Sequence, residues 1–166
     1  MPRQDEVVSA PTPAVAALLR AGVTHQVHRY EHDPAVASYG LEAAEALGLD
    51  GSRVFKTLVT DAGGRLVVAV VPIEALLDLK ALAAAMGAKS AEMADPSAAE
   101  RATGYVVGGI SPVGQKRRLP TVVDESAAAW ETVFVSGGRR GLEIELAPRD
   151  LLAVTQGRLA PIARAR

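Results

Sequence analysis

Two apolar segments joined by a glycine-containing turn constrain the fold of this chain more than any other feature. Residues 53–60 and 66–71 are rich in Val, Leu, Phe and Thr, and the turn between them reads Asp61-Ala62-Gly63-Gly64-Arg65. Two such segments separated by a short glycine turn are typical of a β-hairpin. We therefore expect at least one antiparallel pair of strands.

Helix boundaries and further strands can be assigned around this hairpin. Thr12-Pro13 places a hydroxyl N-cap before a proline at the first helical position, and Gly22 is placed to end that helix. We expect further helices at 38–47, 76–86, 96–103 and 148–155, and further strands at 25–30, 121–124, 132–136 and 142–146. Strands that come partly as hairpins and partly between helices predict an α+β fold with one mixed, largely antiparallel sheet flanked by helices.

The length and composition indicate one globular domain. A chain of 166 residues fits a single domain, which we expect to span residues 12–166 behind a loose tail at 1–11. The sequence has no cysteine, which excludes disulfides, a thiol nucleophile and thiolate metal sites. A polar N-terminus, the lack of a long apolar run and a net charge of −1 predict a cytoplasmic protein without affinity for membranes or DNA.

Lys56 is an unusual residue for a strand. Alternation places it on one face between Val54 and Leu58. Its side chain either extends along apolar surface to water at a sheet edge or is held in a pocket. In a pocket, partial burial would lower the pKa of the ammonium group unless an anion binds there.

A glycine-rich loop follows later in the chain and leads into a basic run. Residues 108–116 read GGISPVGQK, and three glycines in one loop can leave backbone N–H groups free to bind an oxyanion or a phosphate. The spacing matches neither a P-loop nor a nucleophile elbow, and the loop is equally compatible with an ordinary turn. Lys116, Arg117 and Arg118 form either a solvated loop end or a phosphate site.

A second glycine turn carries Arg139 and Arg140 and precedes a strand. On that strand, Glu143 and Glu145 face away from its apolar residues. Two carboxylates on one face are either an acid–base pair or the solvated side of the strand. The three histidines, at 25, 28 and 32, lack the helical pattern of a metal site, so we predict neither a metal nor another cofactor.

Together these segments resemble the YbaK/EbsC-type aminoacyl-tRNA deacylases, which are related to the editing domain of bacterial prolyl-tRNA synthetase. The matching text is VFKTL at 54–58, GGISPVGQK at 108–116 with LPT at 119–121 and DE at 124–125, and residues 136–146. The likeness runs from about residue 12 to residue 164. It implies a partly barrel-like sheet, and hydrolysis of the ester that joins a mischarged amino acid to tRNA, most of all cysteine on tRNA(Pro).

The resemblance also implies a set of site residues. Lys56, Gly109 and Ser111 match the catalytic positions, with Lys56 central. Substrate-binding positions fall on Tyr30, Tyr39, Thr57, Ile110, Pro112, Ser136 and Glu143. Two of these depart from the family pattern, because Glu143 stands where aspartate is usual and Tyr39 where phenylalanine is common.

The mechanism and partners follow from the same resemblance. The substrate's own thiol attacks its ester carbonyl, so the enzyme supplies positioning and oxyanion stabilisation rather than a nucleophile. Both basic clusters, Lys116–Arg118 and Arg139–Arg140, would contact phosphates of the aminoacylated tRNA, and prolyl-tRNA synthetase is a second expected partner. The alternatives are a deacylase for another mischarged tRNA, such as Ala-tRNA(Pro), and a non-catalytic module that binds tRNA or a synthetase.

Overall fold

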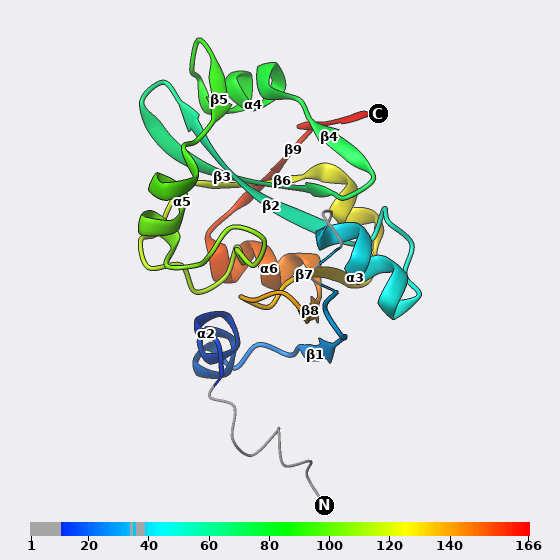
Figure 1. Cartoon of the computed structure of the whole chain (residues 1–166). Coiled ribbons are helices and arrows are strands. Elements are labelled where there is room, and N and C mark those ends of the chain that lie inside the picture. Colours follow the sequence, from blue (N-terminus) through cyan, green and yellow to red (C-terminus); the bar gives the residue numbers. More distant parts are fainter. Residues whose placement is uncertain (1–10, 34, 36–38) are drawn as a thin grey trace, which may run out of the picture.

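The computed structural model describes residues 11–33, 35 and 39–166, and for Tyr39 it describes the backbone only. The described helices are α2 (Pro13–Ala21), α3 (Tyr39–Leu47), α4 (Leu79–Met86), α5 (Pro96–Thr103) and α6 (Pro148–Thr155), with a 3-10 helix η1 (Glu125–Ala129). The described strands are β1 (Gln26–Arg29), β2 (Phe55–Ala62), β3 (Arg65–Pro72), β4 (Ala75–Leu77), β5 (Ala91–Met93), β6 (Thr121–Asp124), β7 (Val133–Ser136), β8 (Leu142–Leu146), β9 (Arg158–Ala160) and β10 (Ala163–Ala165). Figure 1 shows their arrangement.

The strands form a five-stranded sheet and two smaller ones. The order in the largest sheet is β5-β2-β3-β6-β9, in which β3, β6 and β9 run parallel and the remaining neighbours are antiparallel. The antiparallel sheet β1-β8-β7 and the pair β10-β4 complete the set. The expected α+β domain with a mixed, largely antiparallel sheet is confirmed. The described sheet has free edges at β5 and β9, so it is not closed into a barrel.

Local signals account for the elements whose boundaries the sequence predicts. In the β2–β3 hairpin, Gly63 and Gly64 have φ angles of 67° and 87°, which a tight two-residue turn requires. At α2, the Thr12 hydroxyl accepts a hydrogen bond from the backbone N–H of Val15 (3.3 Å), and Gly22 ends the helix at φ 65°. The same hydroxyl donates to the carbonyl of Gly137 (2.5 Å), which ties α2 to the β7–β8 turn.

The predicted helix at 76–86 begins later than expected. Leu76 and Leu77 belong to β4, which pairs with β10, and α4 starts after Asp78. The Asp78 carboxylate accepts a hydrogen bond from the N–H of Ala81 (3.0 Å) and so caps the helix. The strands β4, β5, β9 and β10 each have three residues, too few for alternation to predict them from the sequence.

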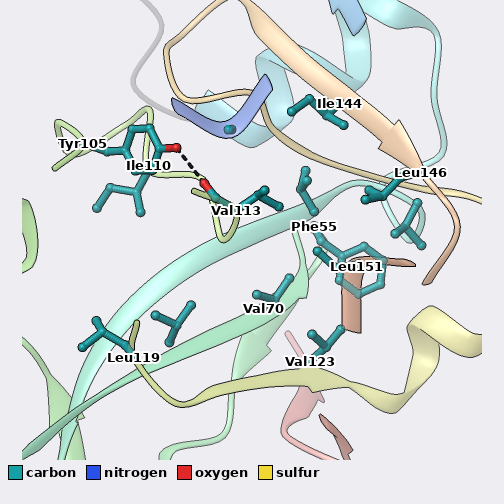
Figure 2. Close-up of a cluster of buried hydrophobic side chains, with 14 of the residues drawn as sticks. Phe55, Val70, Tyr105, Ile110, Val113, Leu119, Val123, Ile144, Leu146 and Leu151 are labelled. Carbon is teal, nitrogen blue, oxygen red and sulfur yellow. Dashed lines mark hydrogen bonds between the residues drawn. The ribbon is translucent and has the colours of Figure 1, made fainter. Parts of the chain in front are cut away.

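Two apolar layers cover the opposite faces of the central strand β3. Val68 and Val70 pack into a cluster formed with α2, α5, α6, β7 and β8, part of which Figure 2 shows. Val67, Ala69 and Val71 pack into a second cluster with α4. Both faces of β3 are thus removed from water, which explains its continuous apolar sequence. No described helix has the length and apolar character needed to cross a membrane.

Candidate active site

A pocket lies along an open edge of β2. On one side β2 pairs with β3 over its whole length. On the other side it pairs with β5 only at residues 60–62, and Val54 just before it bridges Phe134 of β7. Residues 56–58 therefore have no strand partner on that side among the described strands. A cavity of about 390 Å³ has the consecutive residues 54–59 in its wall.

This pocket collects residues from all three segments that the sequence singled out. Its polar and charged lining residues are Tyr30, Lys56, Thr57, Ser136, Arg139 and Glu143. Its other wall is apolar and includes Met93, Ala94, Pro96, Ala99, Val107 and Ile110. The polar residues come from β2, the end of β1 and the β7–β8 hairpin, whereas the apolar wall comes from β5, α5 and the loop that follows α5.

Thr57 offers its main-chain N–H and C=O and its side-chain hydroxyl at this open edge. The carbonyl of Val59 accepts a hydrogen bond from the N–H of Ala94, so the main chain of Val59 points toward β5. Alternate residues of a strand direct their main-chain groups to the same side, which turns the N–H and C=O of Thr57 toward the gap. The Thr57 hydroxyl is buried and has no hydrogen-bond partner in the described part of the protein. A buried polar group without a partner is costly, so these three groups are suited to a ligand.

The Lys56 ammonium is half-buried and already engaged. It donates a hydrogen bond to the carbonyl oxygen of Ala75, the first residue of β4 (2.8 Å). Burial lowers the pKa of Lys56, and the nearby charge of Arg166 lowers it further. An ammonium group has three donors, so Lys56 keeps two for a second partner.

Glu143 is a buried carboxyl group in the wall of the pocket. It lies on β8, opposite Ser136 of β7 and His28 of β1. Burial raises the pKa of Glu143 to about 8, and its Oε2 atom has no described partner. At neutral pH the group is therefore largely protonated and can donate a hydrogen bond. Its side chain does not belong to a solvated strand face, which was one of the two interpretations of the sequence.

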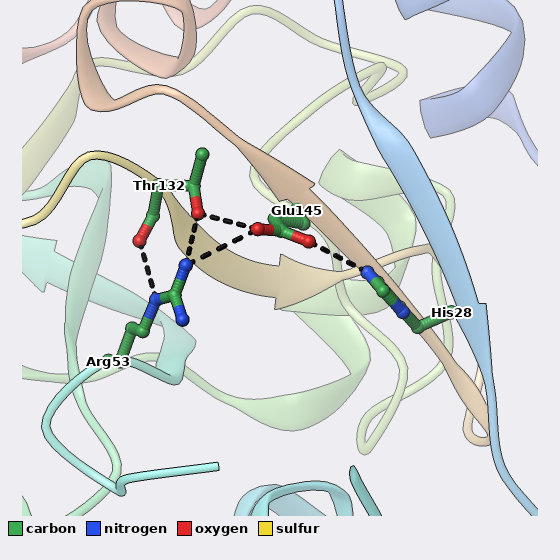
Figure 3. A network of polar contacts seen from close by, with 4 residues as sticks. All are labelled: His28, Arg53, Thr132 and Glu145. Carbon is green, nitrogen blue, oxygen red and sulfur yellow. Dashed lines mark hydrogen bonds and ion pairs between the residues drawn. The ribbon is translucent and has the colours of Figure 1, made fainter.

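Glu145, two residues further along β8, has the opposite character (Figure 3). It accepts hydrogen bonds from the Thr132 hydroxyl (2.6 Å) and from Arg53 (3.3 Å), and it pairs with His28 Nε2 at 2.9 Å. Burial alone would raise the pKa of Glu145, but the bonds from Thr132 and His28 and the charges of His28 and Arg53 together lower it. Glu145 is thus an ion-paired carboxylate outside the pocket lining.

Tyr30 and Ser136 lie beside Glu143. Burial raises the pKa of Tyr30, and its backbone N–H donates to the carbonyl of Gly141 (3.0 Å). The Ser136 hydroxyl accepts a hydrogen bond from the N–H of Gly138 (3.2 Å). Both side chains are half-buried pocket residues. The arrangement can hold a small polar ligand between the Thr57 edge and the Glu143 carboxyl.

The glycine-rich loop lines this pocket in part. Gly108 and Ile110 line it, but Ser111 is fully buried, and its hydroxyl accepts a hydrogen bond from the N–H of Val113 (3.2 Å). The chain turns inward there because the buried Tyr105 hydroxyl donates to the carbonyl of Val113 (2.6 Å). In this conformation Ser111 does not reach the pocket.

Two further predicted loop residues also lie outside the pocket lining. Pro112 is buried and faces a different hollow. Gly109 packs against the next turn, because a Cβ atom at Gly109 would lie 2.8 Å from the Cα of Arg139. The absence of a side chain at Gly109 lets these two turns approach each other.

The remaining predicted residues are placed as follows. Tyr39 begins α3, and its side chain lies outside the described part of the chain. Lys116, Arg117 and Arg118 are exposed, and the last two line the other hollow. Arg139 is exposed at the pocket, whereas Arg140 is half-buried and its charge acts on the pKa of Tyr30 and Glu42. Arg139 and the pair Arg117–Arg118 therefore line different hollows.

The histidines are engaged elsewhere in the fold. His25 bonds to the carbonyl of Val23 (2.7 Å), and His28 pairs with Glu145. His32 Nδ1 lies 2.7 Å from Glu42 Oε1 and joins the loop after β1 to α3. Within the described ranges, no three His, Asp or Glu side chains gather into a group that could hold a metal ion.

The chain is similar to proteins of known family. A model of the aminoacyl-tRNA editing domain matches residues 33–154. EbsC of Enterococcus faecalis, named as a candidate Cys-tRNA(Pro)/Cys-tRNA(Cys) deacylase, is 44% identical over 143 residues, which cover 83% of this chain and 87% of EbsC. YwhH of Bacillus subtilis, which has no assigned function, is 33% identical over 111 residues, covering 66% of this chain and 70% of YwhH.

Comparison of the fold with solved structures points to the same family. A solved structure described as a candidate trans-editing enzyme for prolyl-tRNA synthetase superposes with a TM-score of 0.81 at 27% identity, over 95% of this chain and all of the other. The family model covers most of the chain, including the Lys56 strand, the glycine-rich loop and the Glu143 strand. The protein belongs to the aminoacyl-tRNA editing domain family.

Proposed function

We propose that this protein is a trans-editing hydrolase that removes cysteine from Cys-tRNA(Pro). The observation that carries the proposal is the single pocket wall that brings Lys56 and Thr57 of β2 together with Ser136 and Glu143 of the β7–β8 hairpin. The name of the relative EbsC points to the same substrate.

The reaction that suits this pocket uses the nucleophile of the substrate. The cysteinyl sulfur attacks its own ester carbonyl carbon, the bond from that carbon to the ribose oxygen breaks, and the thiol proton passes to the departing oxygen. The products are tRNA with a free hydroxyl and a thiolactone, which water then opens to cysteine. The enzyme contributes orientation and stabilisation of the negative charge that develops on the carbonyl oxygen.

The described groups suggest a role for each pocket residue. The N–H and hydroxyl of Thr57 at the open edge are suited to the carbonyl oxygen, together with a free donor of Lys56. Protonated Glu143 is suited to donate to an ester or ribose oxygen. Arg139 at the mouth is suited to the phosphate of the terminal nucleotide. We include prolyl-tRNA synthetase as a proposed partner that delivers the mischarged tRNA.

A comparison of amino acids on one tRNA tests the proposal. Release of cysteine, serine and alanine from tRNA(Pro) is measured at saturating enzyme. We expect cysteine to be released much faster than serine, because a hydroxyl is the poorer nucleophile at neutral pH, and alanine has none. Equal rates for cysteine and serine would mean that water or a protein group attacks. Fast release of alanine alone would favour an Ala-tRNA(Pro) deacylase, and tight binding without release would favour a non-catalytic module.

The role of Lys56 is tested in the same assay. We expect Lys56→Ala to lose most of the deacylation activity and to stay folded, because a half-buried lysine on a strand contributes more to ligand binding than to the packing of the core. Lys80→Ala on α4 is the matched control, since Lys80 is exposed and lies outside the pocket lining. Full activity in a folded Lys56→Ala protein would refute the assignment.

A further inference from the structure

A second hollow of about 530 Å³ lies outside the pocket just described. It is enclosed by the last turn of α2, the end of α6 and the segment from residue 112 to 121. Arg20 of α2 and Arg117 and Arg118 of the basic run line it. Arg20 is almost a hundred residues away from the other two in the sequence, so only the fold brings the three together.

Within the described residues, no carboxylate balances the positive charge of this hollow. No carboxylate is among its described lining residues, and within the described part of the chain the three arginines form no ion pair. The helices α2 and α6 both end there, and each helix end carries roughly half a negative charge. Three guanidinium groups against two such helix ends leave about two positive charges, which favours an anion.

The wall of the hollow is held in place by the backbone. The N–H groups of Lys116 and Arg117 donate to the carbonyls at the end of α5 (2.8 and 3.0 Å). The Gln115 side chain donates to the carbonyl of Ser111 (3.0 Å), and Gly114 packs so closely on Pro13 that a Cβ atom would lie 2.5 Å from its carbonyl oxygen. The arginines therefore extend from a fixed segment rather than from a loose loop, which lowers the entropic cost of binding.

Consecutive parts of one loop line the two hollows. Gly108 and Ile110 line the pocket of Lys56, and Pro112, Gly114 and Gln115 line the arginine hollow. Ile110 and Pro112 are two positions apart, so the two linings come within about 7 Å of each other along the chain. A nucleic acid strand that holds its terminal ribose in the pocket and leaves along this loop would bring its preceding phosphates to the hollow.

We propose that the arginine hollow, formed by Arg20, Arg117 and Arg118, binds a phosphate of the single-stranded 3′ end of tRNA, upstream of the terminal nucleotide. The inference rests on the proposed function and adds a second contact between the protein and the tRNA. Arg139 at the pocket takes the terminal phosphate, and the hollow fixes the direction in which the strand leaves. Arginine is suited to this contact because its planar guanidinium group can donate two parallel hydrogen bonds to the oxygens of one phosphate.

The experiment measures the affinity for uncharged tRNA at several salt concentrations. The variants are Arg20→Gln and the double variant Arg117→Gln/Arg118→Gln, and the matched control is Arg65→Gln, an exposed arginine of the β2–β3 hairpin outside both hollows. For each phosphate of a single strand that a variant fails to bind, the slope of log affinity against log salt falls by roughly 0.7. We expect that fall in Arg20→Gln and in the double variant, and no change in Arg65→Gln. Melting temperatures verify that each variant is folded.

A minimal substrate separates this proposal from the proposed function. Cysteine esterified to adenosine has no phosphate, so the wild-type protein and the hollow variants should cleave it at the same rate. Failure of the wild-type protein on both this ester and Cys-tRNA(Pro) would overturn the proposed function itself. If the Arg20→Gln protein cleaves both substrates and its tRNA affinity has the same salt dependence as that of the wild type, only the proposal that the arginine hollow binds phosphate is overturned.

Two other outcomes also decide against the proposal. A changed salt slope in the double variant but not in Arg20→Gln would mean that the basic run contacts RNA outside the hollow. Inorganic phosphate is the probe for a free-anion site. If it raises the melting temperature of the wild-type protein and not of Arg20→Gln, while tRNA affinity is the same in both, the hollow binds a free anion and the tRNA assignment is wrong.

Discussion

Glu143→Gln should make the protein more stable at alkaline pH. Burial raises the pKa of Glu143 from 4.5 to about 8. Between these values the folded protein retains a proton that the unfolded chain has released. The folded state thus binds more protons in this range, and wild-type stability falls as the pH rises through it. Glutamine has nearly the shape of the protonated carboxyl group and does not titrate, so the variant avoids this decrease.

The magnitude follows from the size of the pKa shift. Each pKa unit corresponds to 1.36 kcal/mol, so a shift from 4.5 to about 8 sets an upper limit of about 5 kcal/mol on the stability gained by the variant above pH 8. Entry of water into the adjoining pocket when the carboxylate forms will reduce the gain, because solvation lowers the cost of the charge. At about pH 4 the carboxyl is mainly protonated in the folded and the unfolded wild type alike, so the two proteins should differ little there.

Urea unfolding of both proteins at pH values from about 4 to about 9 measures this difference. Glu145→Gln is the control with the opposite sign, because the pKa of Glu145 is lowered in the folded state. Its contribution is present above the ordinary carboxyl pKa and is lost as the pH falls through the folded value. Glu145→Gln should therefore be less stable than the wild type at neutral pH and converge with it in acid. Parallel pH profiles for the wild type and Glu143→Gln would refute the reasoning.

Two further substitutions test the contacts that hold the glycine-rich loop in place. Gly109→Ala should lower the free energy of unfolding, measured by urea titration, by roughly 1–3 kcal/mol, because its Cβ would lie 2.8 Å from the Cα of Arg139. Gly51→Ala is the control: its Cβ would have its nearest contact at 3.5 Å, so the free energy of unfolding should change by less than about 0.5 kcal/mol. Tyr105→Phe should cost about 1–3 kcal/mol, because it removes the buried hydrogen bond to the Val113 carbonyl; an unchanged thermal melting profile would show that another donor replaces it.

Elements with strong local signals could be predicted from the sequence. The β2–β3 hairpin depends on two adjacent glycines, and α2 depends on a threonine cap, a proline and a terminal glycine. In these cases the interaction that decides the structure joins residues a few positions apart. The short strands β9 and β10 have no such signal. They are held by partners far away in the sequence, since the Asp124 carboxylate accepts hydrogen bonds from the N–H groups of Ile162 and Ala163.

The members of the pocket could be predicted in part, because motif and burial give different information. The segments that carry Lys56, Ser136 and Glu143 do meet in one pocket. Ser111 lies in an equally suggestive segment, yet its side chain is fully buried against the loop's own backbone. The direction of a side chain in an irregular loop is set by contacts such as that of Tyr105 with Val113, and no residue pattern reports them.

Glu143 and Glu145 show why strand alternation alone does not determine chemistry. Both carboxyls leave β8 on the same face. Glu145 meets Thr132, Arg53 and His28, and their hydrogen bonds and charges keep it ionised. Glu143 instead lines the pocket, its Oε2 atom has no described partner, and burial raises its pKa so that it keeps its proton. The difference arises because β7 reaches β2 only at the Val54–Phe134 bridge and leaves the next residues of β2 open beside Glu143. The same gap in strand pairing therefore creates the pocket and leaves its carboxyl group protonated.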